Sequence, residues 1–169
     1  MADIARTIDA EPLTAESWAR FGWIPVTDTD PTDGAHRLDF EWSDVHLNVI
    51  SHTPEEIVHT PDGLLCDAMF RHDTHTQALL TLDVASVIAV APAGVTFVEE
   101  ADLETVRAFL LSPLDSFVLH RGTWHWGPFP TGDRPVTLYN VQGLRYAEDN
   151  TRVDLAGRAL AVEVRAPEA

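Results

Sequence analysis

The stretch Val45-His46-Leu47-Asn48-Val49-Ile50 alternates apolar and polar side chains with the period of two that is typical of a β-strand. Its two valines and its leucine share one face of that strand, and its histidine and asparagine share the other. Similar short runs, separated by proline, glycine and aspartate, predict further strands at residues 77–82, 86–91, 107–111, 116–120, 136–142 and 159–164. Many short strands at close spacing indicate an antiparallel sandwich or barrel.

One helix is expected before these strands, over residues 13–21. Thr14 can cap its first turn, Trp18 supplies an apolar face, and Gly22 can end it. Residues 102–106 predict a single helical turn before a strand. Long helices do not alternate with the strands, which argues against a Rossmann-type sheet.

The bulk properties favour one domain over residues 1–169, because a chain of this length can bury a sizeable core. It carries 27 acidic and 11 basic residues, for a net charge of −16, which argues against nucleic-acid and anionic-membrane partners. The single cysteine, Cys66, excludes an internal disulfide. The first residues lack the features of a secretory signal, and the apolar run 84–90 is too short to span a bilayer. We therefore expect a cytoplasmic protein.

All the basic residues are arginines. The absence of lysine excludes a lysine Schiff base, a pyridoxal-phosphate lysine and a P-loop lysine. A bound anion must therefore be held by arginine or by backbone amides.

Two polar segments contain four of the eight histidines, and His46 could join them from its own strand. Arg71-His72-Asp73-Thr74-His75-Thr76-Gln77 directly precedes an apolar strand. His120-Arg121-Gly122-Thr123-Trp124-His125-Trp126-Gly127-Pro128 follows another. The first segment can place a histidine and a glutamine at the mouth of a barrel, and the glycine turn of the second can bring two histidine rings together.

At some of these positions a purely structural role is the competing interpretation. A histidine before a strand, such as His75, is as often a surface turn residue as a functional one. For Trp124 and Trp126, core packing is favoured over a role in excluding water from a site.

The two segments resemble degenerate cupin motifs. Gly122-Thr123-Trp124-His125 fits the second motif. In the first, His72 takes the second-histidine position, Gln77 takes the glutamate position, and Phe70 stands where another histidine is usual. Together with Arg-His…Thr-Gln-Ala and His-Arg-x-x-Trp-His, this pattern resembles the ureidoglycolate lyase family over residues 12–145.

That resemblance implies a mainly β fold: a cupin-type antiparallel β-barrel or jelly roll with a short N-terminal helix, in one cupin-like domain. It also implies a homodimer that cleaves ureidoglycolate to glyoxylate and urea in allantoin (purine) catabolism. Three positions depart from the family pattern. Phe70 stands in place of an acidic residue, Trp126 in place of a histidine, and His75 in place of a small residue.

The implied reaction needs a base for the carbinol hydroxyl, an acid for the departing nitrogen and a cation for the substrate carboxylate. We expect His72 and His125 to be the acid–base pair, because histidine titrates near neutrality. Arg71 and Arg121 are the candidates for the carboxylate, with surface ion pairs as the competing interpretation.

The remaining candidates surround that pair. Gln77 could hydrogen-bond the hydroxyl or the urea group, and His120 could be a second proton carrier. The expected substrate-binding positions also include His75, His46 and Trp126, with Asn48, Asn140 and Gln142 as lower-rank lining.

A metal is left open. If one binds, the predicted ligands are His72, Gln77, His120 and His125. A site without a required cofactor is favoured, because neither motif supplies an acidic ligand. The alternatives are a metal-dependent isomerase, decarboxylase or dioxygenase on another small hydroxy- or oxo-acid, and a cupin that binds a small carboxylate without turnover.

Overall fold

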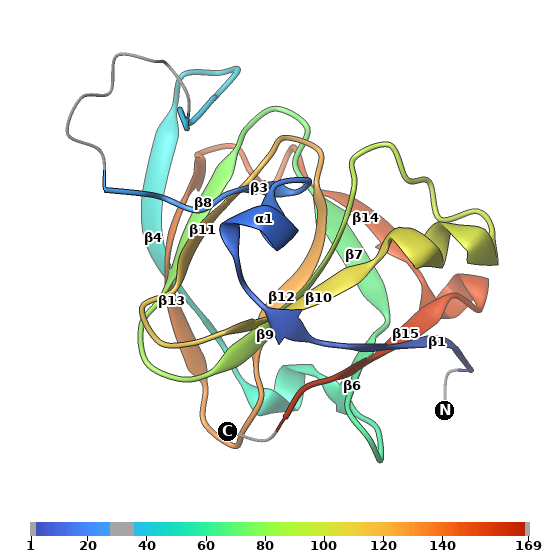
Figure 1. Ribbon diagram of the computed structural model, residues 1–169. Coiled ribbons are helices and arrows are strands. Elements are labelled where there is room, and N and C mark those ends of the chain that lie inside the picture. The colour runs from blue at the N-terminus through green and yellow to red at the C-terminus, as the bar shows by residue number, and fades with distance from the viewer. Residues whose placement is uncertain (1–2, 28–35, 168–169) are drawn as a thin grey trace.

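The computed structural model describes residues 3–27 and 36–167, and its regular structure is mainly strand (Figure 1). The strands are β1 (Ile4–Asp9), β2 (Glu11–Pro12), β3 (Gly22–Trp23), β4 (Val45–His52), β5 (Val58–His59), β6 (Leu64–Cys66), β7 (Ala68–Arg71), β8 (Gln77–Thr81), β9 (Ser86–Ala91), β10 (Arg107–Leu111), β11 (Ser116–Leu119), β12 (Trp124–Pro130), β13 (Val136–Gly143), β14 (Thr151–Asp154) and β15 (Ala161–Arg165). The helices are α1 (Ala15–Trp18) and the 3-10 helices η2 (Pro54–Glu56), η3 (Glu100–Thr105) and η4 (Ala156–Arg158). Within the described ranges, no helix is long and apolar enough to cross a bilayer.

The strands form three sheets. Their orders are β14-β7-β12-β9-β10-β2, β3-β11-β8-β13-β4 and β1-β15-β6-β5. Figure 1 shows β4, β13, β8 and β11 on one side of the molecule and β7, β14 and β15 on the other. The predicted mainly β fold with a short N-terminal helix is confirmed.

The six-stranded sheet is the middle layer, because its strand β9 is buried on both faces. Ile88 and Val90 pack with Phe117 and Leu138 of the five-stranded sheet in one core cluster. The intervening residues of β9 pack with Trp124, Trp126 and the four-stranded sheet in a second cluster. The favoured interpretation of the two tryptophans as core residues is therefore confirmed.

The N-terminal helix is shorter than predicted. A capping box between Thr14 and Ser17 begins α1, and Trp18 donates a 2.9 Å hydrogen bond from Nε1 to the Val118 carbonyl. The helix ends early because Gly22 already pairs with β11. A Cβ at Gly22 would lie 1.6 Å from the Val118 oxygen, so only glycine allows this close pairing.

The predicted strands form at nearly their predicted bounds, whereas β1, β2, β5, β6, β7, β12 and β14 were not predicted. β12 contains residues 124–128 of the second histidine segment, and its glycine and prolines are typical of a turn. The pairing of β12 with β9 shifts register between Trp126 and Phe129, and this irregularity lets the strand continue. β1 pairs in parallel with β15, a long-range contact that its local sequence does not reveal.

Strand β4 presents its apolar face outwards. Val45, Leu47 and Val49 are 55%, 65% and 55% exposed, whereas His46 and Asn48 are half-buried on the inner face. The interior of the five-stranded sheet is therefore partly polar, and this polar lining is the setting of the candidate site.

Candidate functional site

The two histidine segments meet in the structure. His72 follows the end of β7, and His125 lies in β12, where it pairs with Phe70. The ring centroids of His72 and His125 are 5.5 Å apart. His75, from the loop before β8, stacks on His72 at 4.6 Å with an interplanar angle of 22°. The predicted juxtaposition of His72 and His125 is thus present, and His75 adds a third ring.

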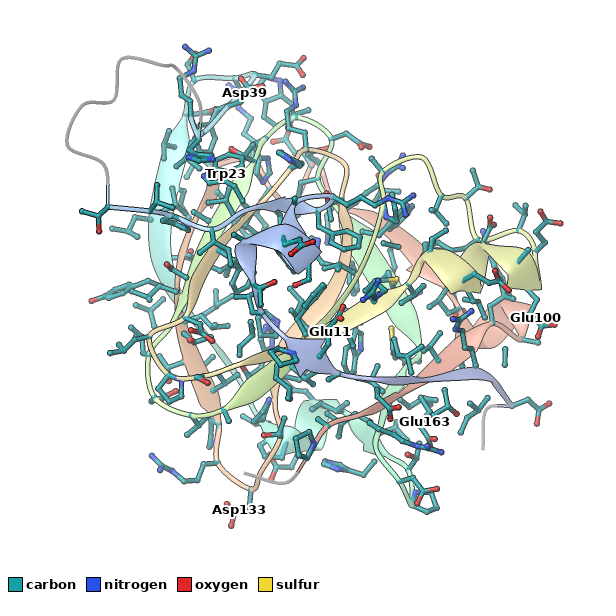
Figure 2. All side chains as sticks on the ribbon, in the orientation of Figure 1. Glu11, Trp23, Asp39, Glu100, Asp133 and Glu163 are labelled. Atoms are coloured by element: carbon teal, nitrogen blue, oxygen red, sulfur yellow. The ribbon has the colours of Figure 1, made fainter. Side chains whose placement is uncertain are left out.

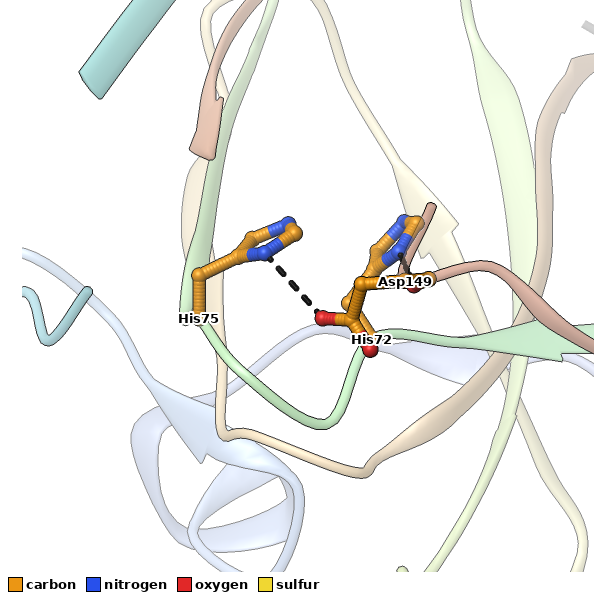
Figure 3. Close-up of side chains that lie close together, drawn as sticks. All are labelled: His72, His75 and Asp149. Carbon is orange, nitrogen blue, oxygen red and sulfur yellow. Dashed lines mark hydrogen bonds and ion pairs between the residues drawn. The ribbon is translucent and has the colours of Figure 1, made fainter. Parts of the chain in front are cut away.

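Asp149 fixes the loop that carries two of these rings (Figure 3). Its carboxylate accepts hydrogen bonds from the backbone N–H of Asp73 at 3.0 Å and of Thr74 at 2.7 Å, and from the Thr74 hydroxyl. The same carboxylate lies 3.4 Å from Nδ1 of His75. Asp149 therefore joins the turn after β13 to the first histidine segment.

Backbone carbonyls set the tautomers of two rings. Nδ1 of His72 lies 2.6 Å from the Asp149 carbonyl oxygen, and Nδ1 of His125 lies 3.2 Å from that of Thr123. A carbonyl oxygen only accepts, so each Nδ1 carries the proton and each Nε2 keeps a free lone pair. Nε2 of His75 is also buried, and no described residue hydrogen-bonds it.

Burial keeps these imidazoles neutral. It lowers the pKa of His72, lowers that of His75 to about 4 and lowers that of His125 to about 3, and for the last two the neighbouring histidines act in the same direction. Burial opposes ionisation of Asp149, but hydrogen bonds from Thr74 and Asp73 outweigh it and lower the pKa of that carboxyl. At neutral pH the cluster therefore holds three neutral rings and one carboxylate.

A chain of side-chain amides lines the inner face of the five-stranded sheet. Gln77 donates from Nε2 to Asn140 at 2.8 Å and more distantly to Gln142 at 3.5 Å, and Asn140 donates to Asn48 at 2.8 Å. Oε1 of Gln77 is buried and lacks a hydrogen-bond partner among the described residues. Gln77 thus offers a free acceptor. His46 lies half-buried on β4, where it pairs with Gln142 of β13.

His120 lies elsewhere. It is exposed, and its ring centroid is 5.4 Å from that of Trp23. Both residues line an open cleft of about 760 Å³ with Asp39 and Arg121. Figure 2 shows Trp23 and Asp39 at the end of the molecule opposite to Asp133. The structure therefore does not bring His120 into the cluster of His72 and His125.

Both candidate arginines are engaged outside the histidine cluster. Arg71 lies 4.6 Å from the centre of the Trp124 ring and donates to the Ala93 carbonyl at 3.1 Å. Its side chain leaves β7 on the opposite face from His72, as strand geometry requires. Arg121 binds the carboxylates of Asp39 at 3.0 Å and Glu41 at 2.9 Å.

Trp126 belongs to the core between the six- and four-stranded sheets. The substrate-binding roles given to Trp126 and the two arginines stay predictions, and so do those of His46 and His75.

Sequence reasoning missed Asp149. It is one acidic residue among 27, and it lies 77 positions from its partner His72. Only the fold of the turn after β13 brings it to the site, so local sequence carries no signal for it.

One group in the described chain has the composition and spacing of a metal site. His72, His75 and Asp149 each offer a ligand atom, and these atoms lie within 4.8 Å of one another. The predicted set of His72, Gln77, His120 and His125 shares only His72 with it. Imidazole nitrogens with one carboxylate suit divalent transition metals, so these residues fit such an ion.

The whole-chain comparison decides the family. Residues 28–163 match the family model for ureidoglycolate lyase. The chain belongs to the ureidoglycolate lyase family. The resemblance carried by the two histidine segments is therefore confirmed. No curated protein sequence matches this family member.

Solved structures that resemble this ureidoglycolate lyase family member share little sequence with it. Bacillus subtilis oxalate decarboxylase, which contains Mn(II) centres, is 12% identical with a TM-score of 0.41 over 70% of this chain and 27% of the decarboxylase. The formate complex of Lactobacillus farciminis oxalate decarboxylase is 11% identical with a TM-score of 0.43, over 70% of this chain and 30% of the decarboxylase. Cellulomonas parahominis L-ribose isomerase with L-ribose is 18% identical with a TM-score of 0.45, over 73% of this chain and 65% of the isomerase. The chain thus spans less than a third of the length of these decarboxylases.

Proposed function

We propose that the chain is an enzyme that cleaves ureidoglycolate into glyoxylate and urea. The observation that carries this proposal is the cluster of neutral imidazoles, with free Nε2 lone pairs on His72 and His125, inside a ureidoglycolate lyase family fold. Ureidoglycolate presents a hydroxyl and several N–H groups, all of which donate hydrogen bonds to such lone pairs.

A single neutral histidine can carry the proton through this reaction. His72 takes the proton of the carbinol hydroxyl as the carbon–oxygen double bond forms and the carbon–nitrogen bond breaks. The bonding pair stays on the departing urea nitrogen, which receives the proton from the His72 imidazolium. Atoms and charge balance, and the reaction needs no ring that is already protonated.

The other members of the cluster fit the leaving group. His125, whose pKa burial lowers to about 3, stays neutral and accepts a urea N–H at Nε2. Oε1 of Gln77 is a second buried acceptor without a partner among the described residues. His72 is therefore assigned the proton transfer, and His125 and Gln77 orient the substrate.

The test is the release of urea from ureidoglycolate by the purified chain, measured above the uncatalysed rate. We expect His125→Ala to lower turnover at least about a hundredfold with the fold intact, because the substrate loses an acceptor that orients it. His59→Ala is the matched control, because His59 is an exposed residue of β5. Urea release no faster than without protein would refute the proposal, and unchanged turnover in His125→Ala would remove that residue from the mechanism.

A second candidate is a metal-dependent enzyme on another small hydroxy- or oxo-acid, such as an isomerase, decarboxylase or dioxygenase. The group of His72, His75 and Asp149 favours it. A screen of such acids with and without chelator separates the two candidates. Strict metal dependence without activity on ureidoglycolate would support the second, and ligand-induced stabilisation without any product would indicate a binding protein. The homodimer and the cytoplasmic location stay predictions.

A further inference from the structure

We propose that Arg152 binds the carboxylate of the substrate and thereby selects small acids over their neutral analogues. The identity of that acid as ureidoglycolate rests on the proposed function, whereas binding of a carboxylate is measured without turnover. Arg152 lies outside the two histidine segments. The arginines inside those segments, Arg71 and Arg121, have other partners.

Strand pairing puts Arg152 in one row with His125. Arg152 of β14 pairs with Phe70 of β7, and Phe70 pairs with His125 of β12. Residues paired across neighbouring strands share one face of a sheet. Val153, the next residue of β14, points to the other face, where it joins the core that includes the four-stranded sheet. The Arg152 side chain therefore leaves β14 on the face that carries His125.

The Arg152 guanidinium is available to an anion. It is exposed, and its central carbon lies 6.0 Å from the centre of the Phe70 ring. Both residues line a hollow of about 230 Å³. Glu56 and Asp67 line the same hollow, yet neither these nor any other acidic residue in the described ranges forms an ion pair with Arg152.

One segment positions both Arg152 and the proton-carrying ring of His72. Asp149, three residues before Arg152, accepts from Nδ1 of His72 at 2.6 Å through its backbone carbonyl. In ureidoglycolate the carboxylate carbon is bonded directly to the carbinol carbon, so the acid group must be held close to the ring that takes the hydroxyl proton. Neighbouring strands lie about 4.8 Å apart, so the backbones of Arg152 and His125 are about 10 Å apart. An arginine side chain and a small acid can together bridge that gap.

The charge of the protein gives a cation at this place a clear purpose. The net charge is −16, and Asp149 places one of the negative charges beside His72. This field repels an anionic substrate, and a positive group at the entrance offsets the repulsion. β14 is the edge strand of its sheet, so Arg152 faces solvent there (Figure 1). A guanidinium also holds a carboxylate through two parallel hydrogen bonds, which fixes its orientation.

Arg107 is a matched comparison in the same row. It pairs with Val90 of β9, which pairs with His125 from the other side, so Arg107 also lies two strands from His125 on the same face. Its guanidinium forms an ion pair with Glu11, however. Its charge is therefore already neutralised, and we expect it to take no part in binding.

The first test measures KM and kcat for ureidoglycolate in wild type, Arg152→Gln and Arg107→Gln. We expect Arg152→Gln to raise KM at least about tenfold and to change kcat less than about threefold, because substrate and transition state carry the same carboxylate. Arg107→Gln should match wild type. Added NaCl should raise the KM of wild type but not that of Arg152→Gln, since salt screens the ion pair. A purely structural role for Arg152 would not produce this difference.

The second test is calorimetry with glycolate and with its neutral amide, glycolamide. Glycolate should bind wild type and Arg107→Gln equally, and Arg152→Gln at least about tenfold more weakly. Arg152→Lys keeps the charge but loses the fork, so its affinity should lie between those of wild type and Arg152→Gln. Glycolamide should bind all four proteins alike.

The proposal is overturned if Arg152→Gln keeps the wild-type affinity for glycolate, if Arg107→Gln loses as much affinity as Arg152→Gln, or if wild type binds glycolate no better than glycolamide. The wild-type comparison of the two ligands and the Arg152→Lys variant test it even if Arg152→Gln does not fold.

Failure of the lyase proposal gives a different result. Glycolate binding that depends on Arg152, without urea release from ureidoglycolate, would leave the carboxylate site standing and refute the lyase. Urea release with an unchanged KM in Arg152→Gln would keep the lyase and overturn the role of Arg152.

Discussion

Acid should destabilise this protein strongly between pH 7 and pH 5, because two buried histidines must stay neutral for it to fold. The pKa of His75 falls from 6.5 to about 4 on burial, and that of His125 falls to about 3. Between these values and 6.5 the unfolded chain binds more protons than the native chain, so a falling pH favours unfolding.

The magnitude follows from those pKa values. Each ring contributes a loss of about 2 kcal/mol in unfolding free energy between pH 7 and pH 5, or about 4 kcal/mol together. This stability is present above pH 6.5 and is lost as the pH falls toward the native pKa values. Asp149 loses its contribution only at lower pH, because its pKa is already below 3.8.

The assay is urea unfolding followed by tryptophan fluorescence at both pH values, in the presence of chelator. His125→Gln removes one titrating ring, so its loss between pH 7 and pH 5 should be smaller than that of wild type by about 2 kcal/mol. His59→Gln, which alters an exposed ring, should keep the full loss. Equal wild-type stability at the two pH values, to within about 1 kcal/mol, would refute the claim that these rings are buried and neutral.

Three further substitutions test how the fold positions the site. Gly22→Ala should cost about 3 kcal/mol in urea unfolding, because its Cβ would meet the Val118 oxygen at 1.6 Å; a loss below about 1 kcal/mol would contradict the close pairing of β3 and β11. Trp18→Ala should cost about 3 to 5 kcal/mol by the same assay, since it empties a fully buried position and removes a hydrogen bond. Asp149→Ala should cost about 3 kcal/mol and speed amide exchange at Thr74, whose N–H loses its acceptor; unchanged exchange there would contradict the described contacts.

Local sequence was sufficient for most of the strands and for one central contact. Period-two alternation predicted β4, because packing on a pleated sheet imposes that period directly, and short apolar runs bounded by turn residues predicted β9 and β10. The motif resemblance predicted that His72 and His125 would meet, and their rings do. The strands have a local cause, whereas the contact of the two histidines was predicted from the family pattern of two segments that lie 53 positions apart.

The failures concern features that only the assembled fold determines. Asp149 reaches His72 from a turn 77 positions away, which no local pattern signals. Arg71 leaves its strand on the face opposite to His72 and lies over the Trp124 ring. Consecutive residues of a strand point to opposite faces, so these two neighbours in sequence could not share one site. His120 lies beside Trp23 because β11 pairs with β3. Strand β3 is only two residues long, so its sequence does not predict this pairing.

The most direct measurement compares urea release from ureidoglycolate by wild-type protein and by His72→Gln at pH 7, with equal folding confirmed by circular dichroism. The account predicts clear catalysis by the wild-type chain and a loss of at least about a hundredfold when the proton-carrying imidazole is replaced by an amide. Equal rates for the two proteins would contradict it.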